Sequence, residues 1–156
     1  MGQENVLIVP GRYDQIRTII KFVIAGGEAA GFDEKALFHL ELCCDEASTN
    51  IIEHAYGAED VGMITVHTKV ANNAFSVTFL DSGRPFSPED VSEPVSYNRE
   101  DSLSSYDLGE FLDKMKVGGL GIHFMRMLMD EVRYNFDPEQ GNELTLVKYL
   151  PERGGE

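Results

Sequence analysis

The sequence DEASTNIIEHAY, residues 45–56, has the periodicity of an amphipathic helix. Apolar side chains recur at steps of three and four through this region, at Leu37, Leu40, Cys44, Ala47, Ile51 and Ala55. Such spacing defines one helical face, and Glu46 and Asn50 lie one turn apart at its edge. A half-buried carboxylate beside a carboxamide can orient a hydroxyl group and bind a hard cation through oxygen. Taken alone, such a pair is more often an ordinary polar boundary.

Hydrophobic patterns on both sides of this helix predict an alternation of short strands and helices. We expect strands at residues 5–9, 64–70, 75–81, 132–136 and 144–150, and helices at 13–25, 34–56 and 122–129. Asp33 is a suitable N-cap for the central helix, and Gly57 a suitable residue to follow its end. Residues 71–73 are typical of a hairpin connection, and the pair Gly26-Gly27 is expected to weaken the end of the first helix.

Asp81 continues the alternation of Phe75, Val77 and Phe79, so it falls on the apolar face of its strand. A carboxylate on a buried face costs free energy unless it is hydrogen-bonded. The pattern Asp-x-Gly-x-Pro-Phe at residues 81–86 also suits a simple turn, which an aspartate often starts. The strand pattern therefore marks Asp81 without deciding between a binding role and a turn.

A cluster of glycines at residues 118–121 opens the helix predicted at 122–129. Free backbone N–H groups at a helix start form a phosphate site in physical terms, although glycines in this position can also serve only as a turn. The preceding segment, about residues 87–117, is rich in serine, proline and acidic residues and is too long for an ordinary connection. Such a segment is usually either a functional lid or disordered. We interpret it as a lid, with a short helix at residues 106–115.

Composition favours a cytoplasmic protein with a single domain, which covers residues 1–156. Hydrophobic residues make up 42% of the 156, and no apolar run is long enough to cross a bilayer. The amino-terminal residues lack the pattern of a signal peptide. The net charge of −14 disfavours direct binding to nucleic acid or to an anionic membrane. The only two cysteines, Cys43 and Cys44, are adjacent and are expected to be reduced and packed.

Three stretches together resemble the GHKL ATPase superfamily, which includes histidine kinases. They are Glu46-x-x-x-Asn50, Asp81-x-Gly83-x-Pro85-Phe86 and Gly118-Gly119-Leu120-Gly121, in the family's order and spacing. The longer stretches around these motifs, residues 45–56 and 119–132, are similar in sequence to bacterial anti-sigma-factor serine/threonine kinases. The resemblance covers roughly residues 5–150.

The resemblance implies a fold, a cofactor pair and residue roles. The fold would be an α/β two-layer sandwich, with a mixed, mostly antiparallel sheet and helices on one face. Glu46 would be the general base and Asn50 the ligand of Mg²⁺, which bridges the phosphates of ATP. Asp81 would accept a hydrogen bond from the adenine amino group, with Gly83 beside it. The backbone from Gly119 through Leu120 and Gly121 to Ile122 would hold phosphates.

The resemblance further implies two protein partners, a sigma factor and a small anti-sigma-factor antagonist that is phosphorylated on serine or threonine. A homodimer is an additional possibility. The sequence departs from the superfamily at its last box, where Gly-Thr is replaced by Gly141-Asn142, so an adenine contact at Asn142 is left open. Three functions compete: a kinase that is also an anti-sigma factor, an ATP-binding interaction module with little or no phosphotransfer, and an ATPase without a protein substrate.

Overall fold

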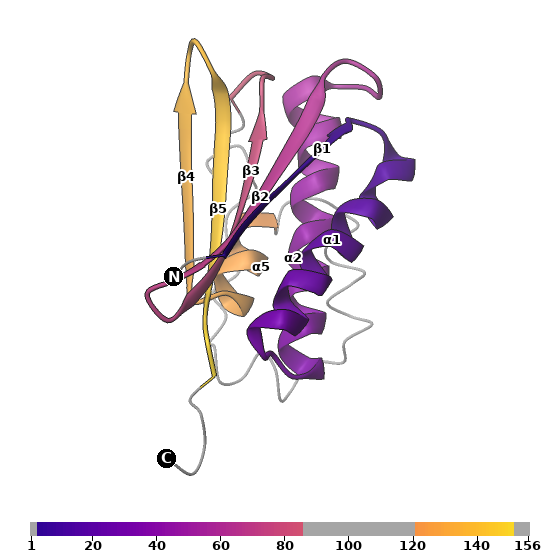
Figure 1. The fold of residues 1–156 in the computed structure, drawn as a ribbon. Coiled ribbons are helices and arrows are strands. Elements are labelled where there is room, and N and C mark those ends of the chain that lie inside the picture. The colour runs from indigo at the N-terminus through magenta and orange to yellow at the C-terminus, as the bar shows by residue number, and fades with distance from the viewer. Residues whose placement is uncertain (1–2, 86–120, 152–156) are drawn as a thin grey trace.

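Residues 3–85 and 121–151 are described by a computed structural model, as are the side chains in these ranges except those of 121–123. These residues form one antiparallel sheet, and the helices among them lie on one face of it (Figure 1). The strands are β1 (Gln3–Pro10), β2 (Met63–Ala71), β3 (Ala74–Asp81), β4 (Glu131–Asp137) and β5 (Gly141–Tyr149). The helices are η1 (Tyr13–Gln15), α1 (Ile16–Ala30), α2 (Glu34–Asn50), η2 (Ile51–Tyr56) and α5 (Gly121–Leu128).

The sheet has the strand order β1-β2-β3-β5-β4, and each pairing between described strands is antiparallel. This arrangement confirms the two-layer α/β fold that the sequence predicts. β5 lies between β3 and β4, so a strand near the end of the chain is hydrogen-bonded to one from its middle. That placement brings Asp81 opposite Asn142 in the register.

Local signals in the sequence set the ends of these elements. The Asp33 side chain accepts a hydrogen bond from the Ala36 N–H at 2.9 Å and so caps α2. Gly57 has φ +81° directly after the helical segment, as expected for a residue at this position. Asn72 and Asn73 both have positive φ and join β2 to β3, which suits a tight hairpin.

The first helix is longer than predicted and runs through both glycines to Ala30. Close packing explains why. A Cβ at Gly26 would lie 3.1 Å from the Phe75 ring, and one at Gly27 would lie 2.9 Å from Leu37. The missing side chains allow α1 to approach both the sheet and α2, so tertiary contact compensates for the low helix propensity of glycine.

The hydrophobic core lies between the helices and the facing side of the sheet. The sheet contributes Ile64, Val66, Phe75, Val77, Phe79, Leu144 and Leu146, and the helices contribute Ile19, Val23, Leu40, Ala47, Phe124, Met125 and Leu128. Cys43 and Cys44 are also buried there as free thiols, as predicted. Among the described residues, no helix is both long and apolar enough to cross a membrane.

Candidate functional site

The two polar residues of the central helix lie buried near its carboxyl end. Glu46 is 9% exposed and Asn50 is 8% exposed. α2 packs against α1 on one side and α5 on another, which leaves this polar pair within the helical layer. Within residues 3–85 and 121–151, neither side chain makes a hydrogen bond to protein. No enclosed side-chain N or O atom among the described residues lacks a partner, so the polar ends of Glu46 and Asn50 are not sealed off from solvent, and a ligand could reach them.

Burial also changes the acidity of Glu46. Loss of hydration, together with the negative charges of Asp45 and Glu53, raises the pKa of Glu46 from 4.5 to about 7. Desolvation is the largest cause, because a carboxylate loses favourable contact with water when it is enclosed. A carboxyl group with a pKa near neutrality can both accept and release a proton at physiological pH, which is the property that a general base requires.

The Asp81 carboxylate ends β3 on the helix-facing side of the sheet and is 7% exposed. Its Oδ1 accepts hydrogen bonds from the Gly83 N–H and from the Asn142 Nδ2, both at 2.8 Å. Its Oδ2 accepts none from the described residues. Burial raises the pKa of Asp81, and the two hydrogen bonds partly oppose that rise. The carboxylate is therefore held in place through Oδ1, and Oδ2 is left to accept a hydrogen bond from a ligand.

Asn142 is occupied by protein contacts on both ends of its amide. Nδ2 donates to Asp81 Oδ1 and to the Arg84 carbonyl, both at 2.8 Å, while Oδ1 accepts from the Tyr134 hydroxyl. Two acceptors on one side identify that atom as the nitrogen, which fixes the orientation of the amide. Asn142 thus supports Asp81 rather than presenting a free donor of its own.

The turn after Asp81 is fastened to the end of the central helix. The last segment, η2, is a π-helix, a form often found at functional sites. The Ala55 carbonyl accepts from the Arg84 N–H at 3.0 Å, and the His54 carbonyl accepts from Arg84 Nε at 2.8 Å. His54 follows Asn50 by four residues, so Arg84 anchors the Asp81 turn about one helical turn beyond Asn50.

Gly83 and Tyr56 make this close contact possible. A Cβ at Gly83 would lie 2.5 Å from the Ala55 carbonyl oxygen, so only glycine fits against η2 there. The Tyr56 hydroxyl accepts from the Ser82 N–H at 3.0 Å and donates to the Met63 carbonyl at 2.5 Å. Gly83 therefore has a packing role in the structure, and its place in the cofactor site stays a prediction.

The predicted phosphate segment lies partly outside the described residues. Gly119 and Leu120 fall outside them, as do the lid predicted at residues 87–117 and its short helix. Gly121 and Ile122 form the first turn of α5, and α5 packs against α2. The start of α5 therefore belongs to a helix that packs against α2, the helix that carries Glu46 and Asn50.

Some contributors to the site were not singled out by the sequence. Tyr134 was predicted only as part of an alternating strand, and that alternation could have placed it on the same face as Asn142. The carbonyl groups of His54 and Ala55 carry no sequence signal of this kind, because a π-helix is not visible in the hydrophobic period. These groups hold the Asp81 turn in place.

The fold and this arrangement define an ATPase of the histidine kinase-like class. The family described as the histidine kinase-like ATPase domain matches residues 9–148, and the chain belongs to that family. It is similar to the serine-protein kinase RsbW of Listeria monocytogenes, with 32% identity over 80% of this chain and 73% of the relative. It is also similar to RsbW of Bacillus licheniformis, with 29% identity over 85% of this chain and 77% of the relative. These matches confirm the family resemblance found in the motifs.

Proposed function

We propose that the protein is an ATP-dependent serine/threonine kinase that acts as an anti-sigma factor. It would bind a sigma factor and phosphorylate an anti-sigma-factor antagonist, in the cytoplasm and without contacting nucleic acid or membrane. The observation that carries the kinase assignment is the pair Glu46 and Asn50, which is buried and free of hydrogen bonds to the described protein. Membership of the ATPase family and similarity to proteins named serine-protein kinases support it.

ATP would lie between the Asp81 turn and the helical pair. Asp81 Oδ2 is the oxygen left to accept a hydrogen bond from the adenine amino group, since Oδ1 is already occupied. The backbone from Gly119 to Ile122, where α5 begins, would donate to the phosphates. Binding at both ends would place the γ-phosphate near the helix that carries Glu46.

Asn50 fits a role in holding Mg²⁺. Its carboxamide oxygen is a hard ligand, and no described residue bonds to it. Within the described ranges no three His, Cys, Asp or Glu side chains gather as a metal site. Mg²⁺ that is bound together with nucleotide phosphates takes only a few of its ligands from the protein. When bound, Mg²⁺ would neutralise charge on the phosphates and help orient them for transfer.

Glu46 would act on the attacking hydroxyl. Its ionised carboxylate takes the proton from a serine or threonine hydroxyl as that oxygen bonds to the γ-phosphorus. The bond from the γ-phosphorus to the bridging oxygen breaks, and ADP leaves with that electron pair. The pKa of about 7 leaves a substantial fraction of Glu46 ionised at neutral pH.

Phosphotransfer by three variants tests the proposal. Glu46→Gln keeps the size of the side chain but removes the proton acceptor, so it should bind ATP normally and transfer phosphate at least ~100-fold more slowly. Asn50→Ala should lose both Mg-ATP binding and transfer. Glu41→Gln, which removes an exposed carboxylate from the same helix, is the matched control and should behave as wild type.

The assay pairs radiolabelled ATP with the cognate antagonist, and a sigma-factor pull-down accompanies it. Transfer by Glu46→Gln at the wild-type rate would show that Glu46 is not the base. A wild-type protein that captures sigma factor but transfers no phosphate would instead be an ATP-binding interaction module. Hydrolysis of ATP without transfer to any protein would identify an ATPase.

A further inference from the structure

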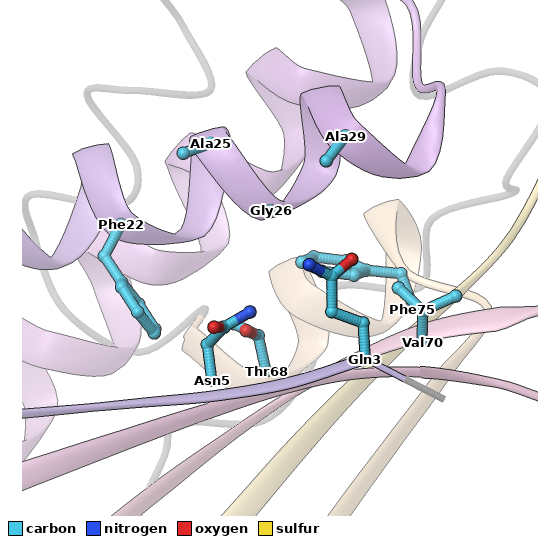
Figure 2. Close-up of a pocket in the computed structure, with 9 residues that line it drawn as sticks. All are labelled: Gln3, Asn5, Phe22, Ala25, Gly26, Ala29, Thr68, Val70 and Phe75. Atoms are coloured by element: carbon cyan, nitrogen blue, oxygen red, sulfur yellow. The ribbon is translucent and has the colours of Figure 1, made fainter. Parts of the chain in front are cut away.

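A pocket separate from the proposed nucleotide site lies between α1 and the β1 edge of the sheet (Figure 2). Its volume is about 280 Å³, near the lower end for small-molecule sites. It is lined by Gln3, Asn5, Phe22, Ala25, Gly26, Ala29, Thr68, Val70 and Phe75. Phe75 and Asp81 lie at opposite ends of β3, about 20 Å apart in an extended strand.

The space exists because helix and sheet both lack bulk at the same place. On the helix side, α1 presents the small residues Ala25 and Ala29 to this space, on either side of Gly26, which itself packs closely against Phe75. On the sheet side, the helix-facing positions of β1 become polar at Asn5 and Gln3. Apolar side chains that would interdigitate across a packed core are absent from these lining positions, so the layers leave a hollow.

Thr68 gives this hollow a chemical character. Its side chain rises from β2 toward α1, beside the amide of its register partner Asn5 (Figure 2). The residue is 3% exposed, yet its hydroxyl makes no hydrogen bond to any residue in the ranges 3–85 and 121–151. No enclosed side-chain N or O atom among the described residues lacks a partner, so this hydroxyl is open to the pocket that Thr68 lines. A ligand atom placed there would find a hydrogen-bonding group that no protein residue already occupies.

The remaining lining residues limit what that ligand can be. The lining set carries hydroxyl and amide groups but no ionisable side chain. The net charge of −14 further disfavours an anion. The rings of Phe22 and Phe75 offer apolar surface on the helix and sheet sides. A neutral ligand with a flat apolar body and one polar end matches these features.

We propose that this pocket binds a small neutral molecule with an aromatic body and an amide or hydroxyl head. The head would hydrogen-bond to Thr68 Oγ1 and to the Asn5 amide, and the body would pack against Phe22 and Phe75. This site is independent of ATP binding, because none of its residues belongs to the Glu46–Asn50 pair or to the Asp81 turn.

Benzamide and benzoate test the proposal, since they share one shape and differ in charge. Titration of the full ¹⁵N-labelled chain, followed by amide chemical shifts, should show saturable benzamide binding at about 10 mM or tighter, the strength expected of so small a ligand. The shifts should centre on Asn5, Gly26 and Thr68. Benzoate should produce no saturable shifts at these positions.

Variants of the pocket sharpen the test. Thr68→Val keeps the side-chain shape and should weaken benzamide binding roughly 3- to 10-fold by removing the hydroxyl. Ala29→Leu adds bulk to the helix side and should abolish binding while leaving ATP binding intact. Thr65→Val is the matched control, because Thr65 is on the same strand with its side chain on the other face of the sheet.

Three results would overturn the proposal: no saturable shift in the wild-type protein, equal binding of benzoate and benzamide, or undiminished binding by Thr68→Val. Spectra of each variant without ligand show whether it is folded. Failure of the kinase assay would leave this result unaffected, because the titration is made without nucleotide or protein substrate.

Discussion

Replacing Glu46 by glutamine should make the folded protein more stable at alkaline pH than the wild type. The folded state raises the pKa of Glu46 from 4.5 to about 7, so it binds this proton more tightly than the unfolded chain does. Stability must then fall as pH rises from the lower value to the higher one, because deprotonation favours the unfolded state. The shift corresponds to about 3 kcal/mol of unfolding free energy in total.

The measurement compares two pH values so that effects of the substitution on packing cancel. The sequence pI of about 4.6 makes the most acidic range unsuitable, because the protein carries little net charge there. Between about pH 5.5 and about pH 8.5, wild type should lose about 2 kcal/mol relative to Glu46→Gln. Urea unfolding without nucleotide or Mg²⁺ gives both free energies.

Glu41→Gln should show no such difference, since Glu41 is an exposed carboxylate on the same helix. If the stability difference between wild type and Glu46→Gln is the same at both pH values, Glu46 is not desolvated in the folded protein. The explanation for its raised pKa, and with it the suitability of Glu46 as a base near neutrality, would then be wrong.

Four further outcomes follow from the site. Phosphotransfer should rise about tenfold per pH unit below the pKa of about 7 for Glu46 and level off above it, as a pH–rate profile under single-turnover conditions would show. Asp81→Asn should weaken ATP binding by roughly 1.5–3 kcal/mol in calorimetry by removing a charged acceptor, and unchanged affinity would contradict the adenine contact. Gly83→Ala, whose new Cβ would lie 2.5 Å from the Ala55 carbonyl oxygen, should lower both the thermal midpoint and ATP affinity, whereas Ser82→Ala should change them little. Tyr134→Phe leaves Asn142 Oδ1 without its donor and should lower the free energy of unfolding by denaturant by about 1–3 kcal/mol. The matched control Tyr149→Phe changes an exposed position and should lower it less, and equal losses would argue against the buried bond.

The sequence alone determined the helices and strands and, within each, most of the residues that share a face. A period of two placed Asp81 on the buried side of its strand, and a spacing of four placed Glu46 one turn from Asn50. Caps and turns were equally readable, as Asp33 shows. These features depend on neighbours a few residues away, which is the range over which periodicity and backbone preference act. The residues of the motifs then indicated the family.

Tertiary structure decided how these local features combine. Asp81 meets Asn142 only because β5 pairs with β3 across 61 residues of sequence, and no local period specifies that pairing. The helical segment ends at Tyr56, so the Ala55 carbonyl has no partner within it and accepts from the Arg84 N–H, which fastens the Asp81 turn to η2, the continuation of α2. The acidity of Glu46 is likewise a tertiary property, because desolvation depends on which elements enclose a side chain rather than on its sequence neighbours.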